Sequence, residues 1–296
     1  MDSEKCRVLL CAVDRGSITA AAEVMGYTVS GVSRMMAALE NEMGFPLLRR
    51  GREGVTPTRE CDRLLPVIRE MVARAEQCRQ LAGELRGVMT GTVTIGTFSG
   101  VATHWLPNMI CAFRKDHPQI DFEILMGGYG EIRQWVMQGR ADYGFVRLPA
   151  CGELKTVELA QDELMVLLPE DHPLSALERV PAQALAQQPF ILLDKAGDRD
   201  EDVMSVFRCA GVEPQVRFTT LDDYAVMSMV EHGLGVSILP RLVLNRLAYR
   251  VALRPLAQPA FRRIGLAMRS GEELTPAARR FLRYLPYRDA ISLSEN

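Results

Sequence analysis

The sequence predicts an α/β protein in which a small helical module and one long helix precede a larger domain of alternating strands and helices. Three observations predict this fold class. Apolar residues recur at helical spacing in three short segments near the N-terminus, and again along one segment from Arg59 to about Arg86. Beyond Gly91, strand-like and helix-like runs alternate, as is typical of α/β domains. A chain of 296 residues is long enough for two or three such units.

The composition is that of a globular protein, with 48% hydrophobic and 24% charged residues. No apolar run approaches the roughly 18 residues of a membrane span. The N-terminal stretch, interrupted by Asp14 and Arg15, lacks the small-residue cleavage site of a secretory signal. We therefore expect a cytoplasmic protein with no membrane partner. Because the formal net charge is −2, any nucleic-acid-binding face must be a local basic patch.

Metal, cofactor and enzyme chemistry are not expected. The seven cysteines include no C-x-x-C pair, so they predict neither a zinc site nor a disulfide framework. The four histidines show no metal-ligand spacing, and no G-x-S-x-G sequence is present. We expect reduced thiols, no cofactor and no catalytic residue. The cysteines are Cys6, Cys11, Cys61, Cys78, Cys111, Cys151 and Cys209.

Three short helices are predicted near the N-terminus. Ser17 and Thr28 are suited to cap the second and third of them, and Gly26 permits the left-handed turn between the two. The helices span Arg7–Val13, Ile18–Met25 and Val29–Met43. One apolar face of each predicts a shared core. The core positions are Val8, Leu9, Ala12, Ala20, Ala21, Val24, Val32, Met36 and Leu39.

The tight turn at Gly26 makes the second and third helices a helix-turn-helix, whose second helix enters the DNA major groove. Its outer face carries hydroxyl and basic side chains that suit base edges and phosphate; a plain solvated face is the alternative. The candidate DNA-binding residues on this helix are Thr28, Val29, Ser30, Ser33 and Arg34. The segment FPLLRRGREGVTPT then predicts a two-stranded wing with Arg50 and Arg52 at a basic tip, placed to contact phosphate or the minor groove. A winged helix-turn-helix domain is thus expected over residues 1–58.

A linker helix is expected over residues 59–88. Its apolar stripe runs from Leu64 to Leu85 and is longer than a lone solvated helix needs. Helix pairing in a dimer explains that length, and packing on its own domain is the alternative. Pro66 is placed to bend the helix near its start.

The remaining residues, 89–296, predict an α/β domain with largely parallel sheets and with ligand sites at the carboxyl ends of strands. The predicted strands are Thr92–Gly96, Asp121–Leu125, Tyr143–Val146, Leu164–Leu168, Phe190–Leu193, Val216–Thr219, Ser237–Leu239 and Ile264–Met268. The predicted helices are His104–Asp116, Gly130–Gln138, Asp200–Ala210, Asp222–Glu231 and Pro276–Leu285.

The stretch GSITAAAEVMGYTVSGVSRMMAALENEMGFPLLRR resembles the helix-turn-helix of LysR-type regulators, with its Gly-Ser, Ala-Ala, Val-Ser-Arg, Leu-Glu and Gly-x-x-Leu-x-Arg pieces in order. The similarity extends over nearly the whole chain, including DHPL at 171–174 and GLGVSILP at 233–240. It implies a transcription regulator that binds double-stranded promoter DNA as a homodimer or homotetramer. In the family, a small-molecule effector controls that binding or the bending of the DNA.

The sequence departs from the family pattern at two positions of the recognition helix. Val29 stands where the family usually has Gln, and Gly31 replaces a typical Ala. Gln reads adenine through two hydrogen bonds, whereas Val makes only apolar contact, for instance with a thymine methyl. The resemblance also implies that Arg49 partly braces the wing, so Arg50 and Arg52 are the stronger DNA candidates.

By the same resemblance, the C-terminal domain consists of two lobes like a periplasmic binding protein, with a ligand cleft between them. Lobe I spans about 91–161 and 265–296, and lobe II about 162–264. The predicted effector-binding residues are Ser99, Gly100, Tyr129, Arg147, Thr219 and Thr220. Ser99 and the backbone amides after it are expected to hold an anion, and Arg147 to pair with a carboxylate, which predicts a small organic anion. The alternatives are a helix cap for Ser99, an ion pair for Arg147 and a packing role for Tyr129.

A redox-responsive regulator is the alternative function. Peroxide-sensing members of the family use a cysteine just after the strand that corresponds to Phe190–Leu193. Here the following loop reads DKAGDRDED and has no cysteine, so Cys209 lacks the expected partner. We therefore expect all seven cysteines to be buried, inert thiols.

Overall fold

The structure, a computed structural model of the full chain, describes all residues except 52–53, 87–88, 151, 153, 196–197, 200, 246–247, 271–273 and 286–296. The chain divides into two compact units. The first contains residues 1–91 with the short segments 138–140 and 275–277, and the second contains the remainder.

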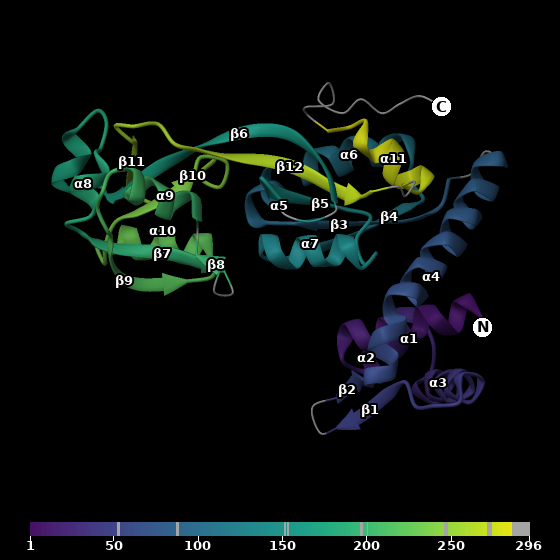
Figure 1. Ribbon diagram of the computed structural model, residues 1–296. Helices are drawn as coiled ribbons and strands as arrows, with labels where there is room; N and C mark the ends of the chain where they lie inside the picture. Colours follow the sequence, from purple (N-terminus) through teal and green to yellow (C-terminus); the bar gives the residue numbers. More distant parts are fainter. Residues whose placement is uncertain are drawn as a thin grey trace. The chain divides into compact units, whose positions relative to one another are not determined.

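Three capped helices begin the first unit: α1 (Ser3–Arg15), α2 (Ile18–Met25) and α3 (Val29–Met43) (Figure 1). The side chains of Ser17 and Thr28 accept hydrogen bonds from backbone amides of α2 and α3, and Gly26 is left-handed with φ of 70°. The predicted bounds of α2 and α3 are therefore confirmed. Helix α1 begins earlier than expected because the Asp2 carboxylate accepts from the amide of Glu4 and caps it there.

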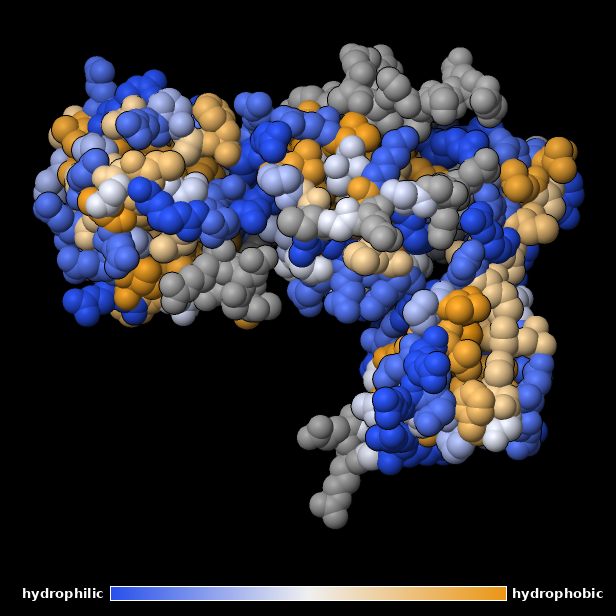
Figure 2. All heavy atoms as spheres, in the orientation of Figure 1, coloured by the Kyte–Doolittle hydropathy of each residue, from blue (hydrophilic) through white to orange (hydrophobic). Residues whose placement is uncertain are grey.

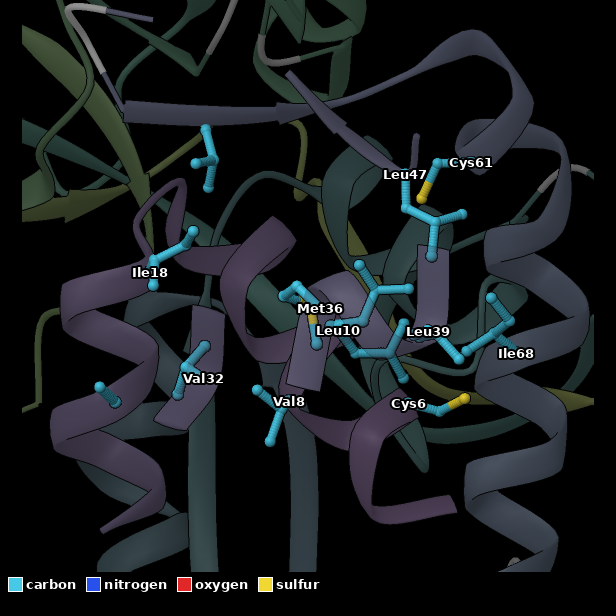
Figure 3. Packing of buried hydrophobic residues seen from close by; sticks show 13 residues of the cluster. Cys6, Val8, Leu10, Ile18, Val32, Met36, Leu39, Leu47, Cys61 and Ile68 are labelled. Carbon is cyan, nitrogen blue, oxygen red and sulfur yellow. The ribbon is translucent and has the colours of Figure 1, made fainter. Parts of the chain in front are cut away.

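The core of this unit is formed by one face of each helix (Figure 3). Helix α1 buries Val8 and Leu9 fully. Helix α3 buries Val32, Met36 and Leu39 fully or almost fully. The prediction for Val24 was wrong, because 55% of this residue is exposed. Ala21 and Ala22 bury the inner face of this short helix instead, and Val24 lies on its outer face.

The wing is a hairpin of β1 (Leu48–Gly51) and β2 (Gly54–Pro57), which pair antiparallel. The start of β2 lies against the turn between α1 and α2, where the amide of Val55 donates to the carbonyl of Gly16 at 2.8 Å. Gly54 has a φ of 120°, and a Cβ there would lie 2.1 Å from the Gly16 oxygen. Only glycine allows this close approach.

Helix α4 (Arg59–Leu85) begins at Thr58, whose hydroxyl accepts from the amide of Cys61 and donates to the carbonyl of Pro46. Its first half packs on the core of the unit through Ile68 and the half-buried side chains around it. The second half differs, because 46% of Leu81 and 90% of Leu85 are exposed. Figure 2 shows hydrophobic atoms gathered at this end of the helix.

In the described part of the second unit, seven strands form one sheet in the order β10-β6-β12-β5-β3-β4, with β11 also paired to β6. The long strands β6 and β12 link its two halves (Figure 1). Strands β7, β8 and β9 form a separate sheet. The strands are β3 (Gly91–Thr97), β4 (Ile120–Met126), β5 (Tyr143–Leu148), β6 (Leu154–Pro169), β7 (Pro189–Lys195), β8 (Asp198–Arg199), β9 (Gln215–Thr220), β10 (Ser237–Pro240), β11 (Val251–Pro255) and β12 (Phe261–Arg269).

The expectation of largely parallel sheets was wrong for the larger sheet. Pairs β3·β5 and β7·β9 are parallel, but β6 pairs antiparallel with β10, β11 and β12, and β12 pairs antiparallel with β5. Strand β6 is also much longer than the predicted Leu164–Leu168. Its first ten residues carry polar side chains such as Glu158 and Gln161 and pair with β12, so hydropathy alone did not reveal them.

Helices cover both sheets: α5 (Ser99–His104), α6 (Leu106–Asp116), α7 (Tyr129–Met137), α8 (Ala182–Leu185), α9 (Glu201–Cys209), α10 (Asp223–Glu231) and α11 (Pro276–Leu282), with a 3₁₀ turn at Pro173–Ala176. The predicted helix from His104 was wrong at its start. His104 ends α5, and α6 begins after Trp105 with Pro107 in its first turn, where a proline is tolerated.

Candidate DNA interface and effector pocket

The N-terminal face of α3 brings together all five residues predicted for this helix. The Thr28 hydroxyl accepts from the amide of Gly31 at 3.1 Å and lies 3.2 Å from the Ser30 hydroxyl. Val29 is 46% exposed. Arg34 is exposed, and its Nε donates to the carbonyl of Ser30 at 3.4 Å, one turn earlier. Ser33 is half-buried beside them. These hydroxyl, apolar and cationic groups form a surface that suits the edges of base pairs.

The wing adds exposed cations. Arg49 and Arg50 of β1 are both exposed, and Arg52 lies outside the described residues. A residue that the sequence analysis missed is Glu40 of α3. Its Oε1 accepts from the amides of Leu47 and Leu48 at 2.8 and 3.2 Å and so fixes the start of the wing to α3. The available signal was the Leu-Glu piece of the resemblance, which places an acid eight residues before the first residue of β1.

A pocket in the second unit joins several of the predicted effector-binding residues. Ser99, Gly100, Tyr129 and Arg147 all line it, whereas Thr219 and Thr220 are not among its lining residues. The cavity has a volume of about 40 Å³, which is enough for only a few waters. The other lining residues are Phe98, Gly127, Gly128, Leu193, Glu201, Asp223, Pro240, Val243 and Arg262.

Arg262 of β12 makes several polar contacts in the pocket wall and was not predicted. Its Nε and Nη2 donate to Oδ2 of Asp162 at 2.9 and 2.7 Å, and both side chains are at least nine-tenths buried. Its Nη1 donates to the Tyr129 hydroxyl at 2.9 Å, and its guanidinium lies 4.8 Å from the centre of the Phe98 ring. A buried guanidinium with these contacts holds the pocket wall in place.

Two further polar contacts cross the pocket. The Ser99 hydroxyl donates to Oδ2 of Asp223, a residue that is only 5% exposed. Phe98, not Ser99, stands at the N-cap of α5, so the helix-cap alternative for Ser99 was wrong. Nη1 of Arg147 lies 3.5 Å from Oδ1 of Asp202, which confirms the predicted alternative of an ion pair within the protein.

Other side chains around the pocket are held by their neighbours. The ring of Tyr129 packs edge-on against Phe98, with 5.3 Å between centroids, and the Arg147 guanidinium lies 5.9 Å from the Tyr129 ring. Arg208 donates a hydrogen bond to Glu201 and lowers the pKa of that carboxyl. Thr220, outside the lining, accepts from the amide of Asp222 at 3.3 Å.

The cysteines do not all match the expectation of burial. Cys6 and Cys61 are fully buried, and burial raises the pKa of the Cys61 thiol to about 11. Cys78, Cys111 and Cys209 are exposed, so the prediction was wrong for these three. Each lies on the outer face of a helix. Cys11 is half-buried, and Cys151 lies outside the described residues.

Neither a membrane-spanning helix nor a metal site is found in the part of the chain that the structure describes. No described helix combines the length and the apolarity that a membrane crossing requires. In the same part of the chain, no three His, Cys, Asp or Glu side chains gather as a metal site would need.

Comparisons with known proteins agree with this arrangement. The family profile described as "LysR substrate binding domain" matches residues 86–289, and "Bacterial regulatory helix-turn-helix protein, lysR family" matches residues 3–62. A probable HTH-type transcriptional regulator, LrrA of Synechococcus elongatus, is 32% identical over 283 residues, 95% of each chain. A probable hydrogen peroxide-inducible genes activator of Mycobacterium leprae is 28% identical over 89% of this chain and 86% of its own.

Solved structures share the fold. A full-length OxyR variant from Pseudomonas aeruginosa matches with a TM-score of 0.72 at 23% identity, over 99% of this chain and 98% of its own. Full-length CbnR in complex with its target DNA matches with a TM-score of 0.69 at 20% identity, over 98% of this chain and 100% of its own. With both profiles matched in order along one chain, this protein belongs to the LysR family of DNA-binding transcriptional regulators with an effector-binding domain.

Proposed function

We propose that this regulator reads promoter DNA with the N-terminal face of α3 and holds the backbone with its wing. The observation that carries the proposal is the exposed cluster of Thr28, Val29, Ser30 and Arg34, with Ser33 beside it, at the start of a helix that the wing flanks. Residues 1–58 form the DNA-binding domain in this proposal, and Arg50 and Arg52 contact phosphate or the minor groove.

Substitution of two arginines tests these contacts. Arg34→Ala removes a group placed at base edges, so binding to a selected operator weakens more than binding to random DNA. Arg50→Ala weakens binding to both and lowers the slope of log affinity against log salt by about 1. Fluorescence anisotropy over a salt series measures both effects, with Arg250→Ala, an exposed arginine of the second unit, as the control. Unchanged affinity in both variants would remove the contact assignment.

The exposed apolar end of α4 favours pairing of this helix with the same helix of a second copy. Leu81 and Leu85 lie in the second half of the helix, beyond the part that packs on the core of its own unit. A second copy of the same helix covers such a stripe, and a dimer presents two recognition helices to two half-sites. Residues 59–88 therefore form the dimerisation helix, with tetramers built through residues 89–296. A regulator that binds chromosomal promoters works in the cytoplasm, and we propose that location for this protein.

The pocket is the proposed effector site. Ser99, Gly100, Tyr129 and Arg147 line it, and Arg147 supplies a cation that suits the carboxylate of a small organic acid. Effector binding shifts the arrangement of the two lobes, about 91–161 with 265–296 and about 162–264, and thereby changes which half-sites are held. Thr219 and Thr220 would contact an effector only in another lobe arrangement.

A redox function is the second candidate, since one relative is named a probable hydrogen peroxide-inducible genes activator and Cys209 is exposed. A peroxide response would oxidise an accessible thiol and change DNA affinity. Measuring operator affinity before and after peroxide treatment separates the candidates. A peroxide-dependent change that disappears in Cys209→Ser favours the redox function; an unchanged affinity leaves the small-molecule effector.

A further inference from the structure

The formal charges that line the pocket cancel. Among its described lining residues, Arg147 and Arg262 are cations, and Glu201 and Asp223 are anions. Both arginines also contact further carboxylates of the protein, Asp202 for Arg147 and Asp162 for Arg262. A ligand with only a carboxylate would therefore bring one uncompensated negative charge into a narrow, partly desolvated space, which is costly.

The two arginines differ in how firmly they are held. Arg262 is 8% exposed and makes short hydrogen bonds to Asp162 and Tyr129, so it belongs to the wall. The side chain of Arg147 is 23% exposed, and its distance of 3.5 Å to Asp202 is longer than that of a good charge-assisted hydrogen bond. A ligand carboxylate that approaches Arg147 to about 2.8 Å would replace Asp202.

Asp223 is an acidic residue that lines the same pocket as Arg147. It begins α10, is 5% exposed, and lines the pocket where the Ser99 hydroxyl donates to its Oδ2. Aspartate is acceptor-only when ionised and has room for several donors. A ligand ammonium that reaches this carboxylate gains a charge-assisted hydrogen bond and offsets the charge that the ligand carboxylate adds.

We propose that the effector is a small zwitterion, an amino acid in the broad sense, whose carboxylate binds Arg147 and whose ammonium binds Asp223. This inference rests on the proposed function of the pocket as the effector site. The apolar lining of Phe98, Leu193 and Val243 accepts a short aliphatic side chain.

Binding of such a ligand has a built-in consequence for regulation. Ser99 and Arg147 precede β6 in the chain, whereas their partners Asp223 and Asp202 follow it. The ligand carboxylate takes the place of Asp202 at Arg147, and the ligand ammonium binds Asp223 beside the Ser99 hydroxyl. The effector thus exchanges the direct link between Arg147 and Asp202 for a link through itself, which gives the two lobes a different equilibrium geometry.

Matched triples of compounds test the ligand class. Each triple contains an amino acid, its deaminated carboxylic acid and its decarboxylated amine, for example alanine, propionate and ethylamine. The panel covers the standard amino acids together with β-alanine and γ-aminobutyrate. Thermal unfolding of the full-length protein identifies binders, and calorimetry gives the dissociation constants. At least one zwitterion is expected to bind about tenfold or more tightly than either partner in its triple.

Variants separate the two charged contacts. Asp223→Asn keeps the shape of the side chain and is expected to weaken zwitterion binding by about tenfold or more while leaving the affinity for the carboxylic acid. Asp222→Asn is the matched control, because this neighbouring acid is exposed and outside the lining. Circular dichroism and the unfolding midpoint without ligand check that both variants fold.

Two outcomes overturn the inference. If a carboxylic acid binds as tightly as its amino acid in the wild-type protein, the ammonium contact is absent, although the pocket stays the effector site. If no zwitterion of the panel binds, the ligand class is wrong. The proposed function fails in a different way, namely when a compound that changes operator affinity binds equally well to Arg147→Ala, because that ligand must then bind elsewhere.

Discussion

Val29 presents an apolar side chain at the position where a glutamine would form two hydrogen bonds to adenine. Because it is 46% exposed at the start of α3, it is placed to contact a thymine methyl. We predict that Val29→Gln changes base preference at one position of each half-site toward adenine, without abolishing binding. Selection from random DNA with both proteins measures this change; identical selected sequences would show that Val29 contacts no base.

The cysteines predict a pattern of thiol reactivity. Thiolate is the reactive form, and a pKa of about 11 leaves Cys61 almost fully protonated at neutral pH, besides being buried. Burial raises the pKa of Cys6 as well. A maleimide reagent at pH 7 should therefore label Cys111 and Cys209 and spare Cys6 and Cys61 until the protein is unfolded. Peptide mass spectrometry reads out each site, and rapid labelling of Cys61 in the native protein would contradict its placement.

The sequence grouped the candidate DNA-binding residues more completely than the residues that line the pocket. Thr28 to Arg34 are neighbours on one helix, so local periodicity placed them together. Asp223 and Arg262 meet Ser99 and Tyr129 across separations of more than 100 residues, which no local pattern encodes. Arg262 also has a structural partner, Asp162, whose position depends on the pairing of β6 with β12.

At the element scale, Glu40 couples the recognition helix to the wing. Replacing it with alanine removes the acceptor of two backbone amides and should destabilise the protein by about 1–2 kcal/mol. Glu40→Gln keeps an acceptor oxygen and serves as the matched control. Chemical denaturation gives the free energy of unfolding, and anisotropy gives DNA affinity. Equal stability of the alanine and glutamine variants would show that Glu40 does not fix the wing.

Helices and strands were predicted well where capping residues or a clear hydrophobic pattern mark them in the sequence. Helices α2 and α3 were predicted to the residue, because Ser17, Gly26 and Thr28 mark their ends chemically. Strand β6 was recognised only in its apolar end, and β11 (Val251–Pro255) was not recognised, because its residues are all half-buried and carry no clear alternation. Their pairing is set by tertiary contacts rather than by local sequence.

At the scale of the whole molecule, the exposed end of α4 predicts the assembly. The double variant Leu81→Glu with Leu85→Glu places two charges in the proposed helix interface, and it should halve the mass of the assembly because like charges repel in a dry contact. Size-exclusion chromatography with light scattering at micromolar concentration measures the mass. Leu177→Glu, at an exposed leucine of the second unit, is the control. An unchanged mass would place the dimer contact elsewhere.

We propose that the protein binds specific genomic sites through the N-terminal face of α3. The most direct test is to incubate the full-length protein with fragmented genomic DNA of its source, recover the bound fragments and sequence them. The wild-type protein is expected to enrich a discrete set of fragments with a shared sequence, Arg34→Ala to lose this set, and Arg250→Ala to keep it. Enrichment of no shared sequence by the wild-type protein, or an unchanged set with Arg34→Ala, would contradict the claim.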